Sequence, residues 1–130
     1  MQVEVSPCSM IISTDEGGKL INSEIKSMLR SMMSREKGKY YMQASNRAIS
    51  NKLGLEIRQV QTYRWGNMIG TVIDIENKSN LPVNISEQEI ASLYQKVRAV
   101  SIDSIYSSIA AKSKIRAYVI TLDKEEDGER

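Results

Sequence analysis

The chain contains no histidine and no phenylalanine, and only one cysteine, one tryptophan and two prolines among its 130 residues. Without histidine, catalytic triads built on an imidazole, histidine-ligated metals and imidazole acid–base chemistry are excluded. The single cysteine, Cys8, cannot form a disulfide within the chain, which predicts a protein of a reducing compartment. Cys8 also has no neighbouring basic residue that would activate its thiol as a nucleophile.

The sequence also lacks an apolar run of the ~20 residues that a membrane-spanning helix requires. Its first ten residues, MQVEVSPCSM, contain no basic segment followed by an apolar stretch, so they do not resemble a secretory signal. Neither a Walker-type phosphate loop nor a G-x-S-x-G nucleophile motif occurs. These absences predict a cytoplasmic protein that is not an enzyme, binds no cofactor and has no membrane partner.

Charge is distributed unevenly along the chain, although the formal net charge is only +2. The segment 24–64 holds nine basic and three acidic residues, a net charge of +6, so the remainder carries −4. A basic segment of this kind attracts polyanions through sequence-independent contacts with phosphates. The alternative interpretation is a solvated basic face that binds nothing.

The basic segment includes the stretch NRAISNKLGLEIRQVQTYRW, residues 46–65. Two short helices joined by a tight turn would bury all of its regularly spaced apolar side chains, which are Ile49, Leu53, Leu55, Val60 and Tyr63. Gly54 falls at the turn, where glycine reaches a positive φ at little steric cost. The second helix would begin near Glu56 and leave its polar side chains on the outside.

This stretch resembles the helix-turn-helix of DNA-binding proteins. The resemblance implies that the second helix enters the major groove, where arginine can pair with guanine and glutamine with adenine. The expected base contacts are Arg58, Gln59, Gln61, Thr62 and Arg64. The expected phosphate contacts are Ser45, Asn46, Arg47, Lys52 and Lys78. The match departs from the family pattern at two positions. The small residue that usually follows the first buried position is Ser50 here, and Glu56 places an acid near the DNA.

The flanking sequence predicts further elements. A run of apolar residues at i, i+3, i+4, i+7 and i+8 is typical of an amphipathic helix, and it comprises Ile25, Met28, Leu29, Met32 and Met33. After the motif, strands over 71–75 and 81–85 would form a hairpin similar to the wing of a winged helix. Residues 86–89, SEQE, form a capping box. The apolar residues of 90–110 continue a helical period, and 115–122 predicts a final strand.

Together these predictions give an α+β fold that is mainly helical, with short terminal strands, in a single domain over residues 1–123. Residues 20–86 would form a winged helix-turn-helix-like core, and residues 87–123 would add C-terminal helices and a strand. The apolar stripes of the C-terminal region exceed what this core needs to cover, which predicts a homodimer; they comprise Ile90, Leu93, Val97, Ile102, Ile105 and Ile109. Residues 124–130 form a charged tail that is expected to be disordered.

The resemblance implies sequence-specific binding of duplex DNA by a small transcriptional regulator, and its size would suit a viral or plasmid-borne protein. The main alternative is a non-enzymatic protein-interaction module, such as an adaptor, inhibitor or assembly subunit, on the same scaffold. A third interpretation starts from Asp74, Glu76 and Lys78, whose D-x-E-x-K spacing is similar to the Mg²⁺-binding residues of some nucleases. Such sites need another acid from an earlier strand, which the sequence does not locate, so a solvated hairpin turn is the preferred interpretation.

Overall fold

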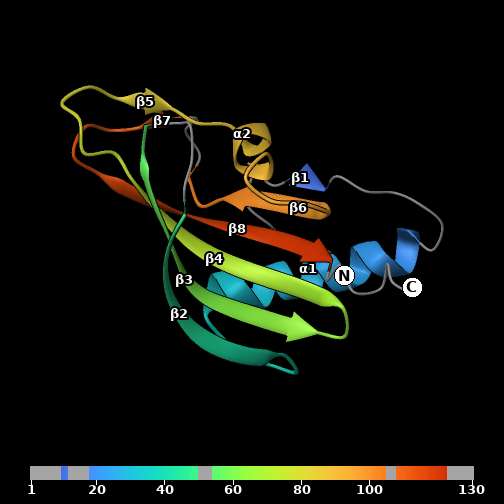
Figure 1. Ribbon diagram of the computed structural model, residues 1–130. Helices are drawn as coiled ribbons and strands as arrows, with labels where there is room; N and C mark the ends of the chain where they lie inside the picture. The colour runs from blue at the N-terminus through green and yellow to red at the C-terminus, as the bar shows by residue number, and fades with distance from the viewer. Residues whose placement is uncertain (1–9, 12–17, 50–53, 105–107, 123–130) are drawn as a thin grey trace.

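The computed structural model describes residues 10–11, 18–49, 54–104 and 108–122. Its main feature is a six-stranded antiparallel sheet in the order β1-β6-β8-β4-β3-β2 (Figure 1). The strands are β1 (Met10–Ile11), β2 (Tyr41–Ile49), β3 (Glu56–Trp65), β4 (Met68–Glu76), β6 (Val97–Ile102) and β8 (Lys114–Leu122). A two-stranded ribbon of β5 (Val83–Asn84) and β7 (Ser108–Ile109) and two helices, α1 (Gly18–Ser34) and α2 (Glu87–Ala91), complete the fold.

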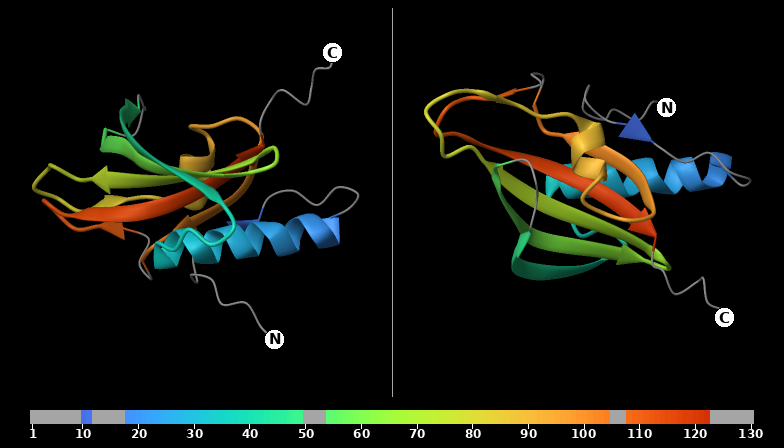
Figure 2. Two further views of the ribbon diagram at one scale, coloured as in Figure 1. Left: turned by 90° about the horizontal axis from the view of Figure 1, so that it is seen from below. Right: turned by 45° about the horizontal axis from the view of Figure 1, so that its top comes forward.

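Helix α1 covers one face of the sheet, which we call the α1 face (Figure 2). The apolar stripe predicted from the sequence is confirmed, because Ile25, Met28, Leu29 and Met32 are all buried against the sheet. Gly70 of β4 allows this close approach, since a Cβ at that position would lie 2.8 Å from the Sδ atoms of Met28 and Met32. The methionine-rich stripe of α1 therefore needs a strand residue without a side chain opposite it.

Helix α2 and the β5–β7 ribbon cover the opposite face, which we call the α2 face (Figure 2). Its core joins sheet residues to residues of the covering elements, and it includes Ile57, Ile73, Ile75, Val100, Val119, Ile85, Ile90 and Ile109. The predicted capping box is confirmed at the start of α2, where the Ser86 hydroxyl accepts from the Glu89 N–H and the Glu89 carboxylate accepts from the Ser86 N–H. The sheet is thus apolar on both faces, which in antiparallel sheets removes a clean alternation of polar and apolar residues.

The predicted helix-turn-helix is wrong, because residues 46–49 and 56–65 lie in strands β2 and β3. The three-residue spacing of Val60 and Tyr63, which resembles a helical period, has another cause. Ile57 faces the α2 core, Tyr63 faces α1, and the pairing with β4 shifts register between Gln59 and Gln61, where Val60 is the additional residue of a β-bulge. The β-branched and aromatic content of β3 favours a strand. Residues Ser50, Lys52 and Leu53 lie outside the described residues.

The mainly helical, winged fold class is also wrong. Residues 71–75 do form a strand, but they belong to β4, which pairs with β3 and β8 rather than forming a wing with residues 81–85. The C-terminal helices are replaced by the five-residue α2 and by β6, where Val97 to Ile102 is rich in β-branched residues. The predicted final strand over 115–122 is confirmed within β8.

The apolar stripes predicted to join a homodimer are largely used within the chain itself. Ile90, Ile102 and Ile109 are each no more than 1% exposed and pack in the core of the α2 face. Ile105 and the tail over 124–130 lie outside the described residues. Of the two helices described, neither is long and apolar enough to cross a membrane. The homodimer itself stays a prediction, but it needs a different surface.

Candidate functional site

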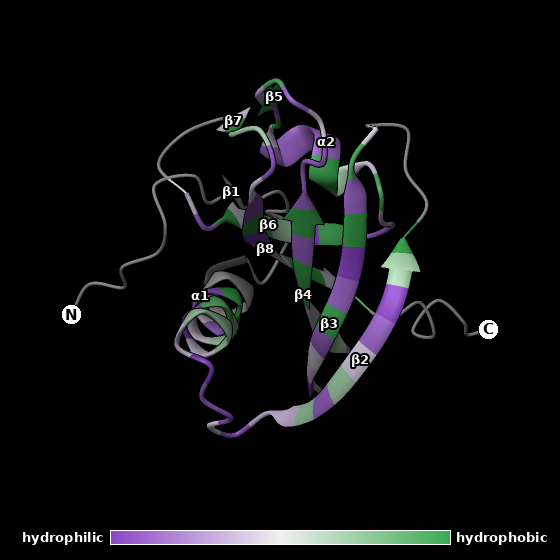
Figure 3. Ribbon diagram, turned by 90° about the vertical axis from the view of Figure 1, so that its left-hand side faces the viewer, coloured by the Kyte–Doolittle hydropathy of each residue, from purple (hydrophilic) through white to green (hydrophobic). Residues whose placement is uncertain are grey.

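The residues predicted to contact DNA are brought together, but on a pair of strands rather than on a helix. Five of them lie on β3, namely Arg58, Gln59, Gln61, Thr62 and Arg64. Three lie on β2, namely Ser45, Asn46 and Arg47. Strands β2 and β3, which we call the β2–β3 ribbon, pair along their length at one edge of the sheet (Figure 3). Lys78 follows β4, and Lys52 lies outside the described residues.

The side chains of this ribbon are divided between the two faces of the sheet. Residues directly opposite each other in a ladder share a face. Arg58 stands opposite Ala48 and Asp74, on the α1 face, and Gln61 stands there opposite Ala44 and Val72. The α2 face carries the pairs Gln59 with Arg47, Thr62 with Gln43 and Arg64 with Tyr41. The five residues therefore cannot act as one reading surface, as a recognition helix would require.

Two of these side chains, Arg58 and Gln59, form hydrogen bonds with a bulge in β2 at the edge of the sheet. The register of β2 with β3 shifts between Ala44 and Arg47, so Ser45 and Asn46 form the irregular part of the strand. The Arg58 guanidinium donates from Nη1 to Asn46 Oδ1 at 2.9 Å. From the neighbouring residue, Gln59 donates from Nε2 to Ser45 Oγ at 3.1 Å. A guanidinium and an amide thus reach the outermost strand at the same point, from an inner strand.

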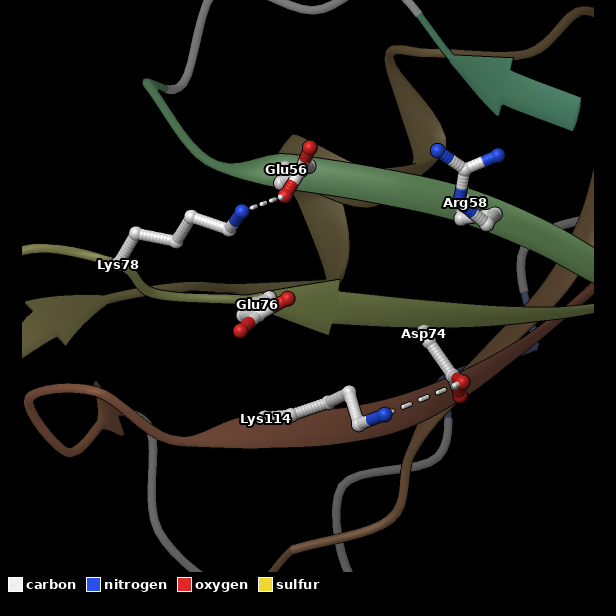
Figure 4. Close-up of a pocket in the computed structure, with 6 residues that line it drawn as sticks. All are labelled: Glu56, Arg58, Asp74, Glu76, Lys78 and Lys114. Atoms are coloured by element: carbon white, nitrogen blue, oxygen red, sulfur yellow. Dashed lines mark ion pairs between the residues drawn. The ribbon is translucent and has the colours of Figure 1, made fainter.

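Beyond the end of α1, the α1 face carries a pocket of about 310 Å³ lined by charged side chains (Figure 4). Its lining residues are Glu56, Arg58, Asp74, Glu76, Lys78 and Lys114. They come together because β3, β4 and β8 are adjacent: Glu56 lies opposite Glu76, and Glu76 lies opposite Lys114.

Ion pairs connect two acids of this pocket, Glu56 and Asp74, to neighbouring bases. Lys78 Nζ lies 2.8 Å from Glu56 Oε1, and Arg116 Nε lies 2.8 Å from Asp74 Oδ1. The hydrogen bond and charge of Lys78 lower the pKa of the Glu56 carboxyl, and the same contacts raise the pKa of Lys78. The hydrogen bond to Asp74 likewise raises the pKa of Arg116. Lys78, which was predicted to bind phosphate, is therefore engaged by an acid of its own chain.

Glu56 is the acid from an earlier strand that the nuclease interpretation required and that the sequence could not locate. It stands beside Glu76, close to Asp74 and Lys78. However, Lys78 engages Glu56 and Arg116 engages Asp74. Across the part of the chain that the structure describes, no three acidic or cysteine side chains are placed so that they could hold a metal ion. The arrangement is an ion-pair network across three strands, which two bases from β8 help to balance.

Sequence reasoning missed the most accessible feature of the site, the position of β2 at the edge of the sheet. Apart from half-buried Met42, Ser45 and Ile49, its side chains are exposed, and Tyr41 is 63% exposed. A strand with this polar composition is typical of a sheet edge. The signal that could have predicted an edge strand here is the mixture of small, polar and apolar residues in its sequence, YMQASNRAI. Comparison with protein-family models and with curated proteins finds no match to this chain, so its site is interpreted from geometry and charge.

Proposed function

We propose that the protein is a non-enzymatic protein-interaction module that binds an extended segment of a partner protein along the edge of β2. The observation that carries this proposal is the open ladder of that strand. β2 spans nine residues and, among the described residues, pairs with β3 alone. An edge strand presents N–H and C=O groups that an added strand can pair with, and many recognition domains bind extended peptides in this way.

The other edge of the sheet is less suited to this role. There β1 covers β6 through only two residues, Met10 and Ile11. β2 is longer, and the bulge at Ser45 and Asn46 together with the charge of Arg47 limits indiscriminate pairing between copies of such edges. An edge strand that is open but carries a bulge and a charged side chain favours selective binding over aggregation.

The ion-pair network supports the non-enzymatic part of the proposal. Its carboxylates Glu56 and Asp74 are held by Lys78 and Arg116, and the pairs are partly exposed to solvent. A general acid or base needs a pKa shifted toward the working pH, whereas the pKa of the Glu56 carboxyl is lowered.

The proposal is tested by selecting ten-residue peptides from a random library on the immobilised protein and then N-methylating the best binder one residue at a time. An added strand turns every second N–H toward its neighbour. We therefore expect N-methylation to weaken binding at alternate positions only. Amide hydrogen exchange should slow in β2 and not in β1. Uniform sensitivity along the peptide, or protection confined to another element, would contradict the proposal.

Duplex DNA is the second candidate, and one observation favours it. The ribbon carries Arg47, Arg58 and Arg64, and the major groove admits a two-stranded antiparallel ribbon as well as a helix. It ranks second because β3 also pairs with β4 along its whole length, so the ribbon does not stand clear of the sheet. Affinity for random duplex DNA that is no better than millimolar at low salt would exclude it.

A further inference from the structure

We infer that the segment that pairs with β2 is acidic, and that its carboxylates are bound by Arg58 on the α1 face and Arg47 on the α2 face. This inference rests on the proposed function and specifies the chemistry of the partner. It follows from the way in which two arginines of different strands converge on one short stretch of the edge.

On the α1 face, the residue between Arg58 and the edge of the sheet is Ala48. Its small side chain lets the exposed Arg58 extend outward, and Nη1 reaches Asn46 Oδ1 at 2.9 Å within the bulge of β2. Figure 4 shows the guanidinium directed away from Asp74 and Glu76. A guanidinium has five N–H donors in a fixed plane, and its side-chain bond to Asn46 uses one of its two terminal nitrogens. Arg58 is therefore positioned to bind a carboxylate that arrives at the edge.

On the α2 face, Arg47 is itself a residue of the edge strand, directly after the bulge. Its side chain is exposed, and its cross-strand neighbour is Gln59, which is bonded to Ser45 rather than to Arg47. Residues that face each other in adjacent strands have Cβ atoms about 4.5–5.5 Å apart, and opposite charges in such pairs are favourable. A strand added outside β2 would thus meet Arg47 on one face and Arg58 on the other within a few residues.

Two acids that lie near Arg58, Glu56 and Asp74, are each engaged by another base, Lys78 and Arg116. The ribbon contains three arginines and a single acid, Glu56. Lys78 engages that acid at 2.8 Å, at the end of β3 far from Arg64. The two strands therefore carry three positive charges against one negative charge, a net charge of +2, which attracts an acidic segment and disfavours a basic one.

The test compares three ten-residue peptides that share an alternating Val/Thr scaffold and differ only in two adjacent central residues, which are Glu, Gln or Lys. Two adjacent positions place one charge on each face of an added strand. Affinities are measured by fluorescence anisotropy at low salt, and hydrogen exchange identifies the strand that is protected. We expect the Glu peptide to bind about tenfold more tightly than the Gln peptide, a typical effect of one charge-assisted hydrogen bond. The Lys peptide should bind least tightly.

Two variants separate the role of Arg58 from general charge. Arg58→Gln should remove most of the preference for Glu over Gln while leaving the affinity of the Gln peptide unchanged. Lys114→Gln is the matched control, because it removes one positive charge from the same face of the sheet but on β8, two strands further from β2 than β3. It should keep the preference. Both side chains are exposed, so unchanged thermal unfolding should accompany both substitutions.

The outcomes separate a failure of the acidic partner from a failure of strand addition at β2. Equal affinity for the Glu and Gln peptides, with β2 still protected, would overturn the acidic partner and leave strand addition standing. If none of the peptides protects β2 at millimolar concentration, the proposed function itself fails. If a single-stranded or duplex oligonucleotide binds more tightly than the Glu peptide and loses affinity on Arg58→Gln, the surface belongs to nucleic acid and the inference is overturned.

Discussion

Replacing Asn77 by alanine should destabilise the protein strongly, because this side chain connects the turn after β4 to the chain around β7. Asn77 follows β4 and is only 1% exposed. Its Nδ2 donates to the carbonyls of Leu81 at 2.8 Å, Ile109 at 3.0 Å and Ala110 at 3.2 Å. Its Oδ1 accepts from the N–H of Ser79 at 3.0 Å and from the Ser79 hydroxyl at 2.7 Å. The amide thus fixes the turn after β4 against the chain around β7.

The expected magnitude follows from these bonds. A net hydrogen bond contributes about 1 kcal/mol to stability, and a buried group left without a partner costs about 1–3 kcal/mol. The Leu81 and Ser79 groups can recover bonds to water because both residues are exposed. The carbonyl of Ile109, a fully buried residue, is the least able to do so. The loss should therefore total about 2–4 kcal/mol, a large part of the ~5–15 kcal/mol that stabilises a typical domain.

Urea unfolding followed by circular dichroism measures this loss as a lower midpoint at an unchanged m-value. Asn77→Asp tests the mechanism, since a carboxylate keeps the acceptor for Ser79 but removes both N–H donors and faces three carbonyl oxygens. It should be at least as destabilising as alanine. Asn80→Ala, an exposed change in the same turn, is the control and should cost less than about 0.5 kcal/mol. A loss below 1 kcal/mol for Asn77→Ala would refute the argument that this amide holds the loops together.

Three further predictions concern packing and titration. Gly70→Val should destabilise by about 1–3 kcal/mol in the same urea assay, because even a Cβ would lie 2.8 Å from two methionine Sδ atoms of α1. Lys78→Gln should raise the pKa of the Glu56 carboxyl toward 4.5, as followed by carboxyl NMR; the pair's contribution in the native protein is present above the unfolded pKa and lost as pH falls through the lowered folded value. Burial raises the pKa of Tyr94 to about 12, so its phenol should ionise well above pH 10 in an ultraviolet titration. The contribution of the neutral Tyr94 phenol to the free energy of unfolding is present below pH 10 and is lost as the pH rises toward 12.

The local parts of the fold were predictable because their signals are local. The stripe of α1 repeats at the helical period over nine residues, and the Ser86–Glu89 capping box is contained within four. The strand of residues 115–122 follows from its β-branched and aromatic content. In each case the residues that predict the element are the residues that form it, so no distant part of the chain is needed.

The β2–β3 ribbon was misinterpreted because tertiary contacts, not local preference, determine its pattern. Ile57 is buried by α2 and the β5–β7 ribbon, and Tyr63 is buried by α1, so successive apolar residues point to opposite faces. The bulge at Val60 then lengthens the spacing between Val60 and Tyr63, which both pack on the α1 side, from two residues to three. Neither the second covering layer nor the bulge is visible in the sequence of the ribbon alone.

The candidate site shows the same division. Its polar residues were identified, since a stretch such as Arg58 to Arg64 exposes polar side chains whether it forms a helix or lies near a sheet edge. What could not be predicted is which residues are neighbours, because that depends on pairing over long distances in the chain. Arg116 binds Asp74 across 42 residues through the register of β4 and β8. This pairing places Asp74 of the D-x-E-x-K segment against Arg116 of β8, while Lys78 of the same segment engages Glu56 of β3.

The role of Glu56 in the observed fold is the opposite of its role in the predicted one. On a recognition helix it would place an acid against DNA, and it therefore counted against the prediction. At the start of β3 it instead engages Lys78, which removes one acid and one base from the surface together. The charge that remains along the ribbon is that of its arginines, of which Arg47 and Arg58 reach the edge strand. Glu56→Gln should release Lys78 without altering the preference of β2 for an acidic partner, as measured with the Glu and Gln peptides. That preference depends on Arg47 and Arg58, and not on whether Lys78 is paired with Glu56.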